Sequence, residues 1–276
     1  MKITLLKGKH ETAEDAKHGL PYIQTCDVYS PECAFQSELE AVRVEDEWML
    51  LLPQSRSRMK DLIAQSVKLN ACPDFARAQK ELLHRNSKPI WYTERWHQRE
   101  SILSRQMHDH ANLVVRKAAV ASLDGRFDDY VRDFWCHWQY SKEEKTKRDT
   151  HIAHNFEIAE ERIRTRYPSL REQRELHLVA RLGAMHCPEQ YCSKPVEVVQ
   201  LPSERSPIFV EYNRVIETAT SPDEARPIML AFALQGISAK QHAGLSDSDI
   251  LAMSISELER TIRALVRAEK KQAKPL

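Results

Sequence analysis

Glycine is scarce in this sequence: only 6 of its 276 residues are glycine. Sandwiches and barrels turn often and use glycine at many of their turns, whereas long helices do not. The chain is also rich in alanine, leucine, glutamate and arginine, which favour helices. We therefore expect a predominantly α-helical α+β protein, with a helical-bundle core and two small β-hairpin elements.

The two expected hairpins follow from stretches with a two-residue period. In residues 42–52, two valines alternate with arginine before an apolar run that ends at Pro53. In residues 196–210, a valine-rich run is separated from a second apolar run by a polar turn. Both patterns predict strand, turn and strand. A weaker alternation over residues 2–7 predicts a short strand.

Helical spacing dominates the rest of the chain. Aromatic and branched residues recur in steps of three and four and predict a buried helical stripe. They are Phe127, Tyr130, Val131, Phe134 and Trp138. Residues 141–147 are charged and predict a connection to the next helix. Residues 169–183 predict a further helix, because Leu176, Val179 and Leu182 share one face and Gly183 follows.

These patterns divide the sequence into four segments. Residues 1–55 form a small β element with loops, and residues 56–185 form the helical bundle. Residues 186–215 contain a cysteine-bearing loop and the second hairpin. Residues 216–276 form a C-terminal helical subdomain.

The overall charge gives little indication of a partner, because the formal net charge is only +1. The amino terminus lacks the apolar run of a signal peptide, and no stretch of eighteen apolar residues occurs. We therefore expect a cytoplasmic protein with reduced thiols and no membrane partner. No phosphate-binding loop or dinucleotide motif occurs, so no cofactor is expected.

Four of the cysteines could bind zinc instead of remaining reduced thiols. His186-Cys187-x4-Cys192 and Cys26-x6-Cys33 could meet in space and supply ligands to zinc. Neither pair has the two-residue spacing of a zinc knuckle, so reduced thiols are the favoured interpretation and Cys26, Cys33, Cys187 and Cys192 are the alternative zinc ligands.

The stretch from Lys147 to Asn155 contains side chains that could act in catalysis, and it lies between two predicted helices. Arg148 offers a planar fork of donors that suits a phosphate, and His154 can take or give a proton near neutral pH. Asp149 could orient Arg148 or His151. Cleavage of RNA needs both roles, because a hydroxyl must lose a proton while the phosphate is stabilised. The alternative is that these residues are solvated charges at a helix start.

The run Arg148-Asp149-Thr150-His151-Ile152-Ala153-His154 resembles the signature of the HEPN superfamily. That signature is an arginine, four to six residues and a histidine, often with Asp after the arginine and an Ile-Ala-His ending. The resemblance covers about residues 91–183. It implies a helical, often dimeric domain and a metal-independent endoribonuclease of a bacterial defence or toxin type, with Arg148, Asp149 and His154 in the active site.

The C-terminal helices support a second hypothesis. Residues 225–266 predict three short helices, the last of which carries Arg260, Arg263 and Arg267. Arginines along one helix can contact phosphates or bases. This pattern predicts a non-enzymatic DNA- or protein-binding component of a nucleoprotein complex, although nearby acidic residues weigh against it. Taken together, the two hypotheses favour RNA over DNA as the nucleic-acid partner. A protein partner or a homodimer is also expected.

Overall fold

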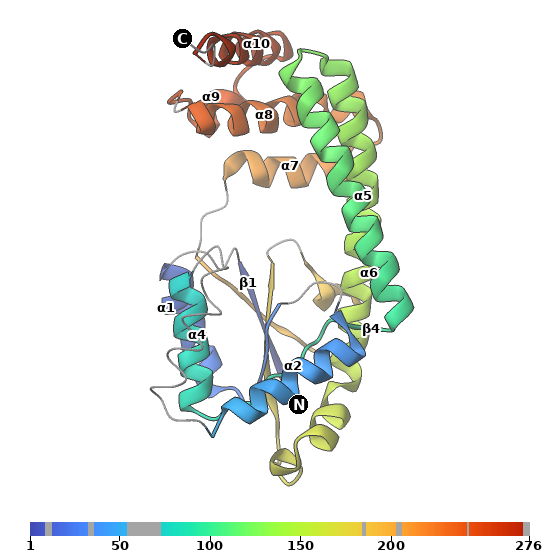
Figure 1. Ribbon diagram of the computed structural model, residues 1–276, viewed down its shortest axis with the longest axis vertical. Helices are drawn as coiled ribbons and strands as arrows, with labels where there is room; N and C mark the ends of the chain where they lie inside the picture. The colour runs from blue at the N-terminus through green and yellow to red at the C-terminus, as the bar shows by residue number, and fades with distance from the viewer. Residues whose placement is uncertain are drawn as a thin grey trace. The chain divides into compact units, whose positions relative to one another are not determined.

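The computed structural model describes residues 1–8, 13–32, 36–53, 73–183, 186–202, 206–241 and 243–272 (Figure 1). Most of the described residues are helical, and a small sheet accompanies them, which confirms a predominantly helical α+β fold. The chain forms two compact units, residues 1–105 with 145–203, and residues 106–144 with 204–276. The four predicted segments do not follow this division, because each unit is built from two separate stretches of the chain.

The first unit is organised around a four-stranded parallel sheet. Its strands are β1 (Lys2–Gly8), β2 (Val28–Ser30), β5 (His177–Gly183) and β6 (Glu197–Gln200). Their spatial order is β2-β5-β1-β6. In β1, Leu5 lies beside Ala180 of β5, and Leu6 lies beside Val199 of β6. The nearly continuous apolar run of β1 suits a central strand covered on both faces, and the predicted strand at residues 2–7 is confirmed.

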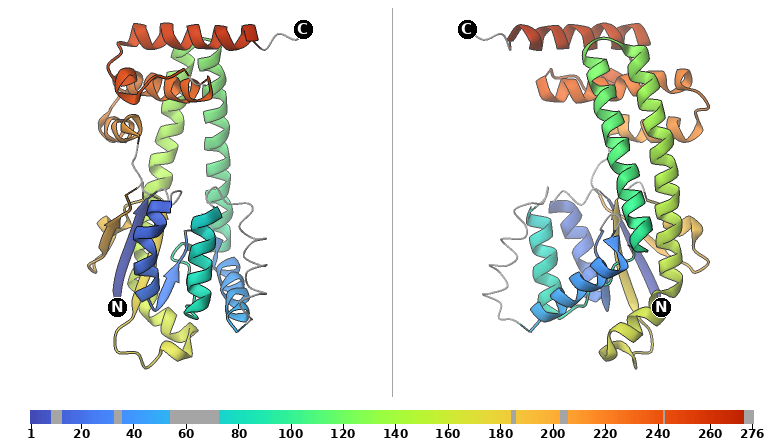
Figure 2. Two further views of the ribbon diagram at one scale, coloured as in Figure 1. Left: turned by 90° about the vertical axis from the view of Figure 1, so that its left-hand side faces the viewer. Right: turned by 45° about the vertical axis from the view of Figure 1, so that its right-hand side comes forward.

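Helices cover both faces of this sheet (Figure 1, Figure 2). They are α1 (Ala13–Thr25), α2 (Glu38–Leu51), α4 (Pro73–Arg85) and part of α6 (Phe127–Arg166). The first unit also contains the start of α5 (Gln98–Leu123). Leu6 belongs to a core cluster with residues of α1, α2 and α4, whereas Leu5 belongs to a cluster with residues of α6. The two-residue period of a strand explains why neighbouring leucines reach opposite faces. A separate pair of short parallel strands is formed by β3 (Gln36–Ser37) and β4 (Arg95–Trp96).

The prediction of a hairpin over residues 42–52 is wrong, because these residues belong to α2. Ser37 and Glu40 form a capping box at the start of this helix, in which each side chain accepts a hydrogen bond from the other residue's backbone. The buried residues of α2 are Ala41, Glu45 and Trp48, which follow the period of a helix. The alternation of valine with arginine was therefore a weaker signal than the capping box before it.

The second hairpin is also wrong. Strand β6 pairs in parallel with β1, and the expected return strand is helix α7 (Pro207–Thr218). Ser206 caps α7, and Pro207 occupies its first turn, where a missing N–H costs nothing. The predicted helix over residues 169–183 is wrong as well, since it contains a short turn of helix and then β5.

The second unit is helical in its described part. Besides portions of α5 and α6, it contains α7, α8 (Pro222–Gln241), α9 (Asp247–Leu251) and α10 (Ile255–Gln272). The predicted connection at residues 141–147 is wrong, because α6 continues through it as one helix of 40 residues. Lysine and glutamate are good helix formers, so a charged segment can continue a helix. Within the described residues, no helix combines the length and apolar character needed to cross a membrane.

The predicted aromatic stripe is confirmed. Each member is at least nine-tenths buried: Phe127, Tyr130, Val131, Phe134 and Trp138. The stripe packs against Tyr212 of α7 and Phe232 of α8, and the rings of Trp138 and Tyr212 meet edge to face with centroids 5.4 Å apart. This cluster forms the core of the second unit.

Truncating Trp138 is expected to destabilise the second unit. Trp138→Ala removes a buried ring that contacts Tyr212 and leaves a cavity, at a cost of about 3–5 kcal/mol. Urea unfolding followed by circular dichroism measures this loss. Tyr140→Ala is the matched control, because Tyr140 lies on the same helix with 42% of its surface exposed. Equal stabilities for the two variants would show that the aromatic cluster does not hold the unit together.

Candidate functional site

Polar side chains gather where the parallel strands of the first unit end. Lys7 is the penultimate residue of β1, and His186 and Cys187 follow Gly183, the last residue of β5. Ligands of open parallel sheets bind at this carboxyl edge. We call Lys7, Asp149, His186 and Cys187 the strand-end site.

The centre of the strand-end site is a hydrogen bond between Asp149 and His186. His186 Nδ1 donates to Asp149 Oδ1 at 2.7 Å, and the Cys187 N–H donates to Oδ2 at 2.9 Å. Lys145 Nζ lies 3.1 Å from the same Oδ2. Asp149 is fully buried, and His186 is 7% exposed. Because the carboxylate fixes the proton on Nδ1, Nε2 can accept a proton or bind a metal ion.

The surroundings of Asp149 favour its charged form. Burial alone would raise the pKa of this carboxyl group, because a buried carboxylate loses its hydration. Hydrogen bonds from His186 and the Cys187 N–H, with attraction to His186 and Lys145, outweigh burial and lower the pKa from its ordinary value. Asp149 is therefore an anion at neutral pH that can stabilise a positively charged His186.

The lowered pKa makes Asp149 a source of pH-dependent stability. The unfolded chain protonates Asp149 near its ordinary pKa of 3.8, and the folded chain does so only at lower pH. The stabilisation is therefore complete above the unfolded pKa and is lost as pH falls through the folded one. We expect urea unfolding to show a steeper loss of stability from about pH 5 to about pH 3 in the parent than in Asp149→Asn. Equal pH dependence in both proteins would contradict this account of Asp149.

A buried lysine contacts Cys187, the residue after the histidine. Lys7 Nζ donates to Cys187 Sγ at 3.3 Å and to Glu189 Oε1 at 2.9 Å. The Lys7 side chain is only 7% exposed. The ammonium group is paired with Glu189, so it can stabilise negative charge that develops on a substrate only when the substrate takes the place of that carboxylate.

Glu32 and His186 flank the glycine that ends β5. A Cβ atom built on Gly183 would lie 3.1 Å from Glu32 Oε1 and 3.8 Å from His186 Cδ2. The first distance is tighter than ordinary van der Waals contact, so a larger residue here would displace the glutamate. Glycine thus lets the carboxylate and the imidazole approach the same strand end.

Arg148, the predicted phosphate-binding residue, is paired with a carboxylate. Its Nε and Nη2 donate to the two oxygens of Glu94 at 3.0 Å and 2.9 Å. Glu94 is 2% exposed, and its carboxylate also accepts a hydrogen bond from Trp96 Nε1 at 3.1 Å. The fork of Arg148 already holds one planar anion, so a phosphate would have to displace Glu94.

The structure does not bring Arg148 and His154 together. Six residues of an α-helix turn the chain by about 600°, which leaves the two side chains roughly 120° apart. His154 is exposed. His151 instead stacks on Trp96, with ring centroids 4.0 Å apart, and hydrogen-bonds the Arg95 carbonyl. Burial lowers the pKa of His151 and favours its neutral form.

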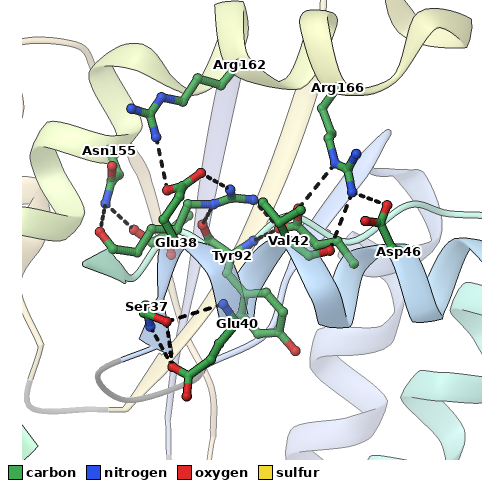
Figure 3. A network of polar contacts seen from close by, with 12 residues as sticks. Ser37, Glu38, Glu40, Val42, Asp46, Tyr92, Asn155, Arg162 and Arg166 are labelled. Carbon is green, nitrogen blue, oxygen red and sulfur yellow. Dashed lines mark hydrogen bonds and ion pairs between the residues drawn. The ribbon is translucent and has the colours of Figure 1, made fainter. Parts of the chain in front are cut away.

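A network around Arg95 fixes the segment that carries Glu94. The Arg95 guanidinium donates to the Tyr92 carbonyl and to Glu38 Oε1, each at 2.8 Å, and pairs with the buried carboxylate of Glu45. Glu45 also accepts from the Tyr92 N–H at 2.9 Å. Figure 3 shows Arg162 reaching from α6 towards Glu38. The network therefore joins α2 and α6 to β4 and to the residues just before it.

The residues of the alternative zinc site do not form a metal site in the described structure. Among the described residues, Cys26, Cys187 and Cys192 take part in no disulfide, and Cys33 lies outside the described residues. Burial raises the pKa of Cys26 to about 12 and that of Cys192 to about 11. Both shifts favour the neutral thiol over the thiolate. Among the described side chains, no group of three or more His, Cys, Asp and Glu residues is arranged to hold a metal ion.

The predicted nucleic-acid-binding residues lie together in the second unit. Arg260, Arg263 and Arg267 are exposed on α10 and line one groove. The structure thus groups these three arginines as their helical spacing predicts.

Sequence patterns assigned Asp149 the wrong neighbours, because it binds His186 rather than Arg148 or His151. Lys7 and Glu94 received no functional assignment from the sequence. A usable signal was the position of His186, three residues after the glycine that ends a buried strand. That signal depends on recognising β5 as a strand.

No protein-family model matches this chain, and neither a curated protein nor a solved structure matches it. The functional assignment therefore rests on the residues of the site and their contacts.

Proposed function

We propose that the first unit is a hydrolytic enzyme whose catalytic centre is the strand-end site. The hydrogen bond between Asp149 and His186 carries this proposal, because it holds a histidine with a buried, charged carboxylate at the carboxyl edge of a parallel sheet. A titratable histidine oriented by a carboxylate is the usual arrangement of a general acid and base.

The proposed reaction uses His186 twice. Nε2 accepts a proton from the attacking water or hydroxyl group while the new bond to the substrate forms. The Asp149 carboxylate stabilises the resulting imidazolium. Nε2 then gives the proton to the leaving group as the bond between that group and the substrate breaks, so the histidine returns to its starting form. Lys7, with the substrate in place of Glu189, stabilises the negative charge on the substrate between these two steps.

RNA is the first substrate to test, because of the HEPN-like signature between Arg148 and His154. That resemblance predicts a metal-independent endoribonuclease in which Arg148 binds the phosphate and His154 acts as the acid or base. The ribonuclease assignment stays a prediction, and the geometry favours His186 over His154 as the proton carrier because His186 is held by Asp149. Arg148 could contact a phosphate only after release from Glu94.

A substrate panel tests the proposed function. The full chain is incubated with a fluorescent RNA oligonucleotide, p-nitrophenyl acetate and bis(p-nitrophenyl) phosphate, each with and without EDTA. We expect turnover of at least one substrate by the parent and loss of that turnover in His186→Ala. Turnover that is unchanged in His186→Ala would contradict the proposal, and RNA cleavage that survives EDTA would support the ribonuclease prediction.

A further inference from the structure

One face of helix α10 is basic. Arg260, Arg263 and Arg267 follow steps of three and four residues, are exposed, and line a groove of about 340 Å³ together with Glu259. The opposite, apolar face of α10 is buried, and the helix packs on α8. We call the three arginines the arginine face.

The acidic neighbour of the arginine face is neutralised from another helix. Glu259 and Arg263 are four residues apart on α10, a spacing at which they would ordinarily pair. Arg226 of α8 instead donates to Glu259 Oε1 at 2.7 Å and to Asp128 Oδ1 at 2.6 Å. The side chains of Arg226 and Glu259 are 21% and 23% exposed, so this contact is partly shielded from water. Arg226 therefore leaves the charge of Arg263 uncompensated by Glu259.

Two further contacts shape the arginine face. The Arg263 guanidinium lies over the ring of Phe127, 4.7 Å from its centroid, and this contact orients the side chain. Glu257, three residues before Arg260, binds the Ser254 N–H at 2.8 Å and the Ser254 hydroxyl at 2.7 Å. Its carboxylate thus serves as a helix cap. The arginine face keeps its positive charge although acids lie nearby on the same helix.

We propose that the arginine face binds the phosphate backbone of nucleic acid and that Arg226 keeps this face available by holding Glu259. Seven residues separate the outer arginines, which places them about 10.5 Å apart along the helix axis. That length covers roughly three nucleotide steps of one strand. A membrane-bound helix would need an accessible apolar face, and that of α10 is buried against α8. The arginine face is independent of the strand-end site, so either proposal can fail alone.

Fluorescence anisotropy of labelled oligonucleotides tests the proposal. The full chain is titrated into a duplex DNA and a single-stranded RNA of about 20 nucleotides, between about 50 and 200 mM salt. Changing Arg260, Arg263 and Arg267 together to alanine is expected to weaken binding and to reduce the salt slope by about 0.9 per lost duplex contact, or about 0.7 on a single strand. Arg132→Ala is the control, because Arg132 is exposed in the same unit but already pairs with Asp129 at 2.9 Å.

Variants of Arg226 test whether this residue keeps Glu259 from pairing with the arginine face. Arg226→Ala is expected to weaken binding although Arg226 lies outside the groove lining, because Glu259 then pairs with Arg263. Adding Glu259→Gln is expected to restore binding, whereas a merely structural role for Arg226 predicts no restoration. Glu259→Gln alone is expected to bind at least as tightly as the parent and shows that this change is tolerated. Thermal melting of each variant reports folding.

Several results would overturn the proposal. They are a parent that binds neither oligonucleotide at low salt, a triple arginine variant that binds like the parent, and a double variant that binds no better than Arg226→Ala. Binding to phosphatidylserine vesicles without binding to either oligonucleotide would also overturn it. Tighter binding of the RNA than of the DNA, or the reverse, identifies which nucleic acid supplies the phosphates.

Discussion

Replacing Asp149 by asparagine is expected to lower kcat by about 10²–10⁴-fold on the substrate that the strand-end site turns over. The amide is nearly the same size, and its oxygen can still accept the hydrogen bond from Cys187. It carries no charge, however, and cannot stabilise the imidazolium form of His186 or fix its proton on Nδ1 as firmly. Steady-state kinetics at neutral pH measure the loss, and circular dichroism checks the fold.

Lys145→Ala is the matched control for Asp149→Asn. Lys145 lies 3.1 Å from Oδ2 of this carboxylate, whereas His186 bonds to Oδ1, and the Lys145 side chain is 27% exposed. Its removal is expected to change kcat only a few-fold. A decrease as large as that of Asp149→Asn would mean that charge in general, rather than the Asp149–His186 hydrogen bond, governs the reaction.

Arg95→Ala is expected to destabilise the first unit by about 3–5 kcal/mol, because it removes the buried guanidinium that pairs with the Glu45 carboxylate and leaves only the Tyr92 N–H and a more distant Arg166 beside it. Glu45 is fully buried, and burial raises its pKa despite the opposing charge of Arg95. Arg95 itself is 5% exposed and also holds the Tyr92 carbonyl. Urea unfolding of the parent and the variant gives the difference in free energy.

Arg162→Ala separates this effect from a general loss of charge. Arg162 contacts Glu38, a partner of Arg95, but its side chain is 46% exposed, so its loss is expected to cost less than about 1 kcal/mol. The double change Arg95→Met with Glu45→Leu is expected to recover most of the stability, since apolar residues can replace a buried ion pair. An Arg95→Ala protein as stable as Arg162→Ala would contradict the role given to this network.

The sequence predicted the parts of the fold whose signal is local. The aromatic stripe of α6 shows one period without a competing one, and the apolar run at residues 2–7 is too short for a helix that follows the same spacing. Strand β5 is also buried on both faces and shows no alternation, but it lies in a longer stretch that can be aligned with a helical period. The three-residue spacing of Leu176, Val179 and Leu182 then suggested a helix that tertiary contacts override.

The pairing of Asp149 with His186 could not be predicted from local patterns. Asp149 and His186 are 37 residues apart, and they meet because β5 pairs with β1 while α6 packs on the same sheet. The spacing of Arg148 and His154 suggested a shared cleft only while the helix around them was unknown. A continuous α6 turns these two side chains apart and directs Arg148 to Glu94.

The most direct measurement compares kcat/KM of His186→Ala and His154→Ala on the same substrate, with both proteins shown to be folded. The strand-end site predicts that His186→Ala loses at least about 10²-fold, whereas His154→Ala, which alters an exposed residue, retains the activity of the parent. The opposite result, with His154→Ala inactive and His186→Ala active, would contradict the proposed catalytic centre and favour the ribonuclease signature on α6.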